Sequence, residues 1–78
     1  MNHETLLNRI TFDTSVMVGK PTIRGLRITV EQILKALSAD ISAQELLEDY
    51  PELELEDIKA SLLYAAELIS NEQVLEVA

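Results

Sequence analysis

Carboxylates are the side chains of this chain whose types and spacing could do chemistry. Six of them crowd into one short stretch: Glu48, Asp49, Glu52, Glu54, Glu56 and Asp57. Magnesium prefers oxygen ligands, but its site needs oxygens that converge in space, and crowding along a chain does not supply that. Most of these acids stand at helix starts, where they complement the positive end of the helix dipole, or on a polar helix face. We therefore expect no metal and no other cofactor.

Other catalytic groups are scarce in the sequence. The 78 residues contain no cysteine and a single histidine, His3, which excludes a dedicated zinc cluster. The chain has neither a phosphate loop of the G-x-x-x-x-G-K type nor a G-x-G-x-x-G fingerprint. We expect a non-enzymatic binding module.

The basic residues indicate contact with a partner. Three of the six lie in the segment G-K-P-T-I-R-G-L-R-I, at Lys20, Arg24 and Arg27. Short apolar runs broken by proline and glycine predict a β arm or hairpin over residues 10–28. On this arm the three side chains are placed to bind DNA phosphates or an acidic protein surface. In the alternative, the two arginines form ion pairs with carboxylates of the helical half, within one chain or across a dimer.

Charge is divided unevenly between the two halves of the chain. Residues 1–35 carry five basic and three acidic side chains, whereas residues 36–78 carry one basic and eleven acidic side chains. Attraction to phosphates supplies most of the affinity for duplex DNA, so a net charge of −8 argues against DNA binding by the whole surface. The acidic half suits a basic protein partner, or it serves solubility alone.

Three helix starts share one pattern: an apolar residue, a cap, two residues, an acid or amide, and a second apolar residue. The pattern begins at Ile28, Ile41 and Leu53, and it combines a capping box with a hydrophobic staple. It predicts helices over residues 29–39, 42–50 and 54–70. Apolar residues in the last helix recur at the spacing of one helix face, which we expect to face the core: Ile58, Leu62, Ala65 and Ile69.

These elements predict one mainly α domain over residues 1–78, a three-helix bundle of helix-turn-helix layout with a short N-terminal β arm. In this layout the last helix would read DNA with its first turns, at Glu56, Asp57 and Lys59. Two of these three side chains are acids that phosphates repel, so a solvated acidic helix is the competing interpretation.

Self-association is a further expectation. A two-stranded arm is barely stable alone, so it must lie on the helices or pair with another chain. A homodimer across a two-fold axis would supply the second of these contacts. We expect Phe12, Ile23, Tyr50 and Tyr64 to anchor a dimer or a partner. No apolar run approaches the ~20 residues that span a bilayer, and the N-terminus lacks a signal-peptide layout. A cytoplasmic location without membrane contact is expected.

The arm and the helix starts together resemble the bacterial family known as domain of unknown function 433. The likeness is carried by Leu7-x-Arg9-Ile10 and Asp13, Gly19-Lys20-Pro21-x-Ile23-Arg24-Gly25-x-Arg27-Ile28-Thr29-Val30, Glu45-Leu46-Leu47-x-x-Tyr50-Pro51-x-Leu53, and Asp57-Ile58-x-Ala60-x-Leu62-x-Tyr64-Ala65. Val18 stands where the family commonly has a second glycine. The resemblance implies a homeodomain-like three-helix fold and an antitoxin-like role beside a PIN-like ribonuclease toxin.

Two functions follow as expectations. In the first, the chain is an antitoxin-like dimer that covers a basic PIN-like toxin and touches operator DNA as part of the complex. In the second, it is a stand-alone helix-turn-helix regulator that reads DNA with the arm and the last helix.

Overall fold

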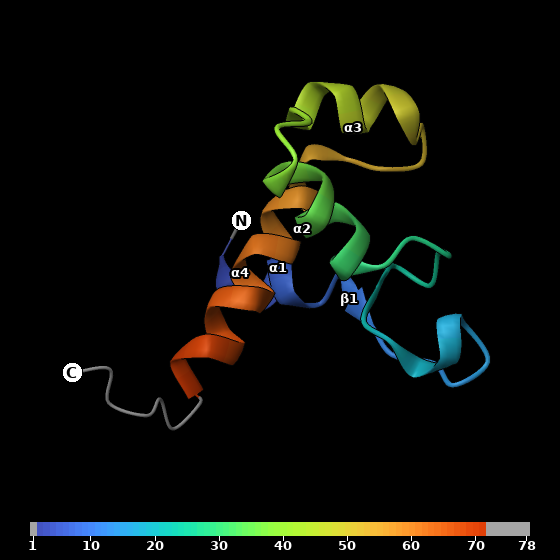
Figure 1. The fold of residues 1–78 in the computed structure, drawn as a ribbon. Helices are drawn as coiled ribbons and strands as arrows, with labels where there is room; N and C mark the ends of the chain where they lie inside the picture. Colours follow the sequence, from blue (N-terminus) through green and yellow to red (C-terminus); the bar gives the residue numbers. More distant parts are fainter. Residues whose placement is uncertain (1, 72–78) are drawn as a thin grey trace.

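Four α-helices and a small hairpin make up residues 2–71, the part of the chain that the computed structural model describes (Figure 1). In chain order the elements are α1 (His3–Leu7), β1 (Ile10–Thr11), the 3-10 turn η1 (Met17–Gly19), β2 (Thr22–Ile23), α2 (Val30–Ser38), α3 (Ala43–Asp49) and α4 (Leu55–Asn71). The two strands form an antiparallel sheet. The prediction of a mainly helical chain with a short β arm is confirmed. The described residues contain four α-helices, one more than the predicted three-helix bundle.

The additional helix, α1, is only five residues long. Asn2 caps it, because the Asn2 side chain accepts a hydrogen bond from the Thr5 amide at 2.8 Å. A helix this short is unstable in isolation, and α1 packs against α4. Tertiary packing decides its conformation, which explains why periodicity in the sequence did not reveal it.

The other helix starts follow the predicted pattern. Complete capping boxes join Thr29 to Gln32 at α2 and Ser42 to Glu45 at α3. At α4 the bonding is one-sided: the Asp57 carboxylate accepts the Glu54 amide hydrogen at 2.8 Å. No helix of the described residues is long and apolar enough to cross a membrane.

The hairpin is fastened on both sides. Ile10 faces Ile23 and Thr11 faces Thr22 across the two strands. On the other edge of β2, the Ile23 amide donates to the Ile28 carbonyl at 3.0 Å. Both edges of β2 are therefore occupied within the chain. The arm lies on its own helices, one of the two arrangements expected of it, and its pairing with a second chain stays a prediction.

The core lies where the hairpin, α2, α3 and the first turns of α4 meet. Its buried apolar residues are Ile10, Ile23, Ile28, Val30, Ile33, Leu46, Leu53, Ile58 and Ala60. Ile23 is fully buried, so it cannot serve as the predicted surface anchor.

The expected core face of α4 is only half covered. Ile58 is buried, but Leu62 and Ile69 are 49% and 62% exposed. In Figure 1 the C-terminal turns of α4 extend past the body that packs around its start. The predicted apolar face of this helix therefore enters the core at its start and, among residues 2–71, stays exposed along its outer half.

Backbone strain concentrates in η1. Met17, Val18 and Gly19 have φ angles of 50°, 58° and 78°, all in the left-handed region. Glycine adopts this conformation freely, whereas a β-branched residue does so at a steric cost. The Val18 residue is 90% exposed, so its side chain gains little packing in return.

Val18→Gly is expected to raise the free energy of unfolding by about 1 kcal/mol, because the relief of left-handed strain exceeds the entropy that glycine loses on folding. Urea unfolding followed by circular dichroism measures the change. Val16→Gly is the matched control, since Val16 is extended at φ −120° and should lose stability. A loss of stability in Val18→Gly would contradict the strain argument.

Candidate functional site

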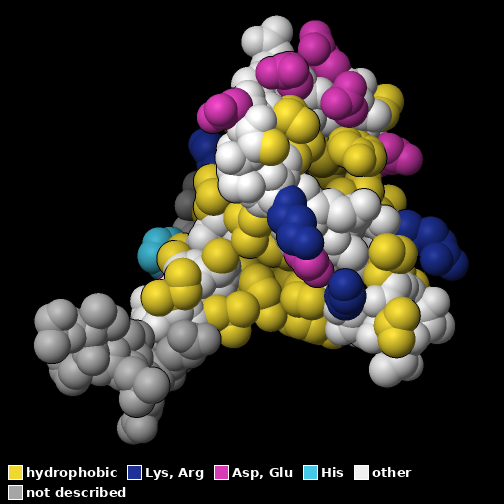
Figure 2. Space-filling model, viewed as in Figure 1, with side chains coloured by type: hydrophobic (Ala, Val, Ile, Leu, Met, Phe, Trp, Pro, Cys, Tyr) yellow, Lys and Arg dark blue, Asp and Glu magenta, His cyan; other side chains and the backbone are white. Residues whose placement is uncertain are grey.

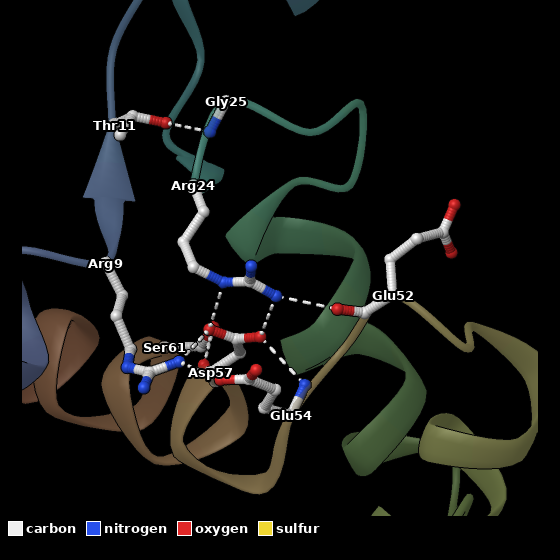
Figure 3. A network of polar contacts seen from close by, with 8 residues as sticks. All are labelled: Arg9, Thr11, Arg24, Gly25, Glu52, Glu54, Asp57 and Ser61. Carbon is white, nitrogen blue, oxygen red and sulfur yellow. Dashed lines mark hydrogen bonds and ion pairs between the residues drawn. The ribbon is translucent and has the colours of Figure 1, made fainter.

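One buried carboxylate joins the hairpin to the helices (Figure 3). The Asp57 side chain is fully buried at the start of α4. Its Oδ1 accepts hydrogen bonds from Arg9 Nη1 at 2.9 Å and Arg24 Nε at 3.1 Å, and its Oδ2 accepts from Arg24 Nη2 at 2.9 Å. With the Glu54 amide, four donors converge on this one group. We call Asp57, Arg9 and Arg24 the Asp57 cluster.

The local backbone of the hairpin aims Arg24 at Asp57. Arg24 and Gly25 have φ angles of 46° and 75°, which turn the chain sharply after β2. The Gly25 amide donates to the Thr11 hydroxyl at 2.8 Å, and this bond holds the turn against β1. Arg24 Nη2 also donates to the Glu52 carbonyl at 2.6 Å. One guanidinium thus contacts both the start of α4 and the loop before it.

The charges in this cluster stabilise one another. Burial by itself would raise the pKa of Asp57, but the hydrogen bonds from Arg24, the Glu54 amide and Arg9 outweigh it and hold that pKa below its ordinary value. Arg9 also pairs with Glu54, with Nη1 and Oε1 2.7 Å apart. Hydrogen bonds to Glu54 and Asp57 raise the pKa of Arg9, so its side chain stays charged. The Asp57 cluster is a structural clasp.

The sequence left two interpretations of the arm arginines: contact with DNA or a partner, or ion pairs with carboxylates of the helical half. For Arg24 the structure shows the second, because Arg24 pairs with Asp57 of its own chain. The clasp also removes Asp57 from the predicted recognition surface, because a buried carboxylate with four donors cannot reach a base edge. Arg9 is the participant that the residue-by-residue reasoning missed. Its one signal in the sequence was its place in the block Leu7-x-Arg9-Ile10 that carries the family resemblance.

The other two predicted contact residues of the arm, Lys20 and Arg27, take no part in the Asp57 cluster. Lys20 pairs with Glu31 at 3.2 Å, and Glu31 pairs with Lys35 at 3.0 Å on α2. These two lysines lower the pKa of Glu31, with the Lys35 contact the larger cause. Arg27 is exposed and forms no ion pair with any residue of the described chain.

The first turns of α4 present little positive charge. Lys59 is exposed, Glu56 is half-buried, and neither forms an ion pair within residues 2–71. The carboxylates at this helix start therefore face outward beside a single ammonium group.

A dense acidic surface covers α3 and the turns on either side of it (Figure 2). We call it the acidic end. Its exposed members are Asp40, Glu45, Glu48, Asp49 and Glu52. None of them forms an ion pair with a described residue. Among residues 2–71 no three histidine or carboxylate side chains are placed to hold a metal ion.

Three of the predicted aromatic and apolar anchors lie at the surface. Phe12 is 60% exposed and its ring lies 6.0 Å from that of Tyr64, centroid to centroid. Tyr64 is half-buried between two shallow grooves, and Tyr50 lies exposed at the end of α3. Phe12, which follows β1 in the hairpin, therefore packs against Tyr64 of α4.

Comparison with known proteins gives a family without an assigned activity. A family model described as "Protein of unknown function (DUF433)" matches residues 10–65. The uncharacterized protein y4eO of Sinorhizobium fredii (strain NBRC 101917 / NGR234) is 30% identical over 56 residues. That alignment covers 72% of this chain, and the chain spans 25% of the length of y4eO. No solved structure matches, so a homeodomain-like fold stays a prediction.

Asp57→Asn is expected to lower the free energy of unfolding by about 3 kcal/mol, because it leaves two arginines beside a buried amide that cannot neutralise them. Urea unfolding at neutral pH measures the loss. Glu56→Gln is the matched control, since the neighbouring carboxylate has no ion pair and should stay within about 0.5 kcal/mol of the wild type. Equal effects of the two changes would show that the clasp does not stabilise the fold.

The advantage of the wild type over Asp57→Asn is expected to depend on pH. The pKa of Asp57 is lowered in the folded state, so the unfolded chain takes up this proton first. The advantage is therefore fully present above pH ~4, the ordinary range of an aspartate, and is lost as the pH falls through the folded-state value. Unfolding of both proteins between pH 7 and pH 2.5 measures the difference, and a gap that widens in acid would contradict this assignment.

Proposed function

The chain belongs to the DUF433 family, and we propose that it is a non-enzymatic, antitoxin-like binding module whose acidic end covers a basic, PIN-like ribonuclease partner. The observation that carries this proposal is the acidic end itself. Its five exposed carboxylates lie together over α3 and have no counter-ion in the described chain.

The distribution of ion pairs supports this assignment. Elsewhere in the described chain the acids Glu31, Glu54 and Asp57 are matched by Lys20, Lys35, Arg9 and Arg24. No basic residue lies between Lys35 and Lys59, the stretch that contains the acidic end. Unpaired charge of one sign steers a partner of opposite sign and disfavours wrong partners through like-charge repulsion. A basic protein surface is the partner that this chemistry would recognise.

DNA reading by α4 alone has weaker support. Its first turns carry Glu54 and Glu56 outward, whereas Asp57 is buried in the clasp. Lys59 is the one basic residue after position 35, and phosphates would repel this helix start. Lys20 and Arg27 on the arm retain a role in operator binding within a complex, because a basic partner would supply the missing positive charge.

An affinity capture from the native host tests the proposal. The tagged wild type should retain a stoichiometric basic protein at about 150 mM salt and release it near 500 mM, because screening weakens contacts between exposed charges. The retained protein should degrade RNA once released and be inhibited when this chain is added back. Glu48→Gln combined with Glu52→Gln should weaken the inhibition about tenfold, since two attractive charges are lost.

Glu4→Gln combined with Asp13→Asn is the control for that pair, because it removes two exposed carboxylates far from α3 along the chain. It should inhibit as the wild type does. Equal inhibition by both double variants would remove the acidic end from the proposal. A captured protein without ribonuclease activity would overturn the partner class.

A further inference from the structure

The outer half of α4 carries an apolar surface that residues 2–71 leave open. Leu62, Leu68 and Ile69 are 49%, 51% and 62% exposed. Leu62 and Ile69 lie seven residues apart, about two helical turns, so both project from the same side of α4. In Figure 2 hydrophobic side chains spread over the part of the molecule away from the acidic end.

This surface has the periodicity of a helix–helix contact. Ile58, Leu62, Ala65 and Ile69 recur at alternating spacings of four, three and four residues, as do the a and d positions of a coiled-coil seam. Ile58 enters the core, whereas Leu62 and Ile69 continue the same seam into solvent. The seam is thus built for a second helix that residues 2–71 do not supply. We call Leu62, Ala65 and Ile69 the outer seam.

We propose that the outer seam is a self-association surface, on which a second copy of the chain lays its own α4 antiparallel across a two-fold axis. The order of residues fits this arrangement. Leu62 and Ile69 lie equally far from the midpoint between Ala65 and Ala66. In an antiparallel pair that crosses at this midpoint, Leu62 meets Ile69 of the second copy, and the two alanines allow close approach. Such an isologous contact uses the same patch twice.

A groove beside the seam extends the contact. It encloses about 300 Å³ between α2 and α4, and Val30, Leu34, Ala65 and Leu68 line it. Helices pack by inserting a ridge of side chains on one helix into a groove on the other. Here the outer seam would be the ridge, and the groove that Ala65 also lines would receive the ridge of the second copy.

Charge favours a second copy over a basic partner at this place. Lys20 and Lys35 also line the groove, with Glu31 between them in ion-pair contact. A basic protein would meet two lysines here, whereas a second copy brings the same two lysines with Glu31 already paired between them. Glu56, near the start of α4, lies about 15 Å along the helix axis from Ala66 at the crossing. This is nearly two Debye lengths at physiological salt, so the carboxylates at the two helix starts would not oppose pairing.

Sedimentation equilibrium on the purified chain, from about 1 to 200 μM, tests the proposal across the concentrations where a modest interface dissociates. The wild type should associate to twice its 8.7 kDa mass. Ile69→Glu should raise the dissociation constant at least 100-fold, because it places a charge opposite Leu62 of the second copy. Leu55→Glu is the matched control, since Leu55 is 43% exposed in the first turn of the same helix, about 15 Å along the axis from the crossing between Ala65 and Ala66. Circular dichroism confirms that each variant is folded.

A monomeric wild type over the whole range would overturn the proposal, and so would a dimer that survives Ile69→Glu. A cysteine adds a test of geometry, because the chain has none of its own. Ala66→Cys should form a disulfide-linked dimer under mild oxidation, whereas Leu55→Cys should not. Reversal of that pattern would exclude the antiparallel crossing. Failure here is separable from failure of the proposed function: Ile69→Glu should still inhibit the nuclease, and the Glu48 and Glu52 double variant should still dimerise.

Discussion

The fold depends on a single buried carboxylate that must remain charged. Asp57 lies in the core beside Ser61 and Ile58, where an unpaired charge would be prohibitively costly. Two guanidinium groups and a backbone amide from three separate segments satisfy it. Each partner position follows from this need: the strained turn at Arg24, the short α1 that precedes Arg9, and the loop that presents the Glu52 carbonyl. An apolar residue at position 57 would remove the ion pairs of the clasp and leave the hairpin attached by its apolar core residues, the Arg9–Glu54 ion pair and the bond from Arg24 to the Glu52 carbonyl.

The part of this architecture that local rules govern could be predicted from the sequence. The capping pattern located α2, α3 and α4, because each cap is decided by residues three positions apart. The alternation of apolar and turn residues located the hairpin. What the sequence could not reveal is contact across long separations. Arg24 and Arg9 reach Asp57 over 33 and 48 residues, and no periodicity relates such positions. For the same reason α1 was missed and Ile23 was assigned to the surface.

The described chain has two dissimilar ends. Around α3 the five carboxylates of the acidic end have no basic residue beside them to form an ion pair. The outer seam is uncharged, and two lysines line the groove next to it. The helix that joins them was expected to bury one continuous face, and it buries only the first part. Amphipathic periodicity indicates that a face will be covered, but it does not indicate which molecule covers it. The described residues thus place exposed carboxylates and an exposed apolar seam on separate parts of one small domain.

The clasp also bears on the order in which the molecule acquires its shape. The capping boxes of α2 and α3 need only neighbouring residues, so these turns can form while the chain is still emerging from the ribosome. The clasp cannot close until residue 57 is available, and closing loops of 33 and 48 residues is slow compared with forming a helical turn. During synthesis Arg9 and Arg24 are therefore made long before the carboxylate that pairs with them.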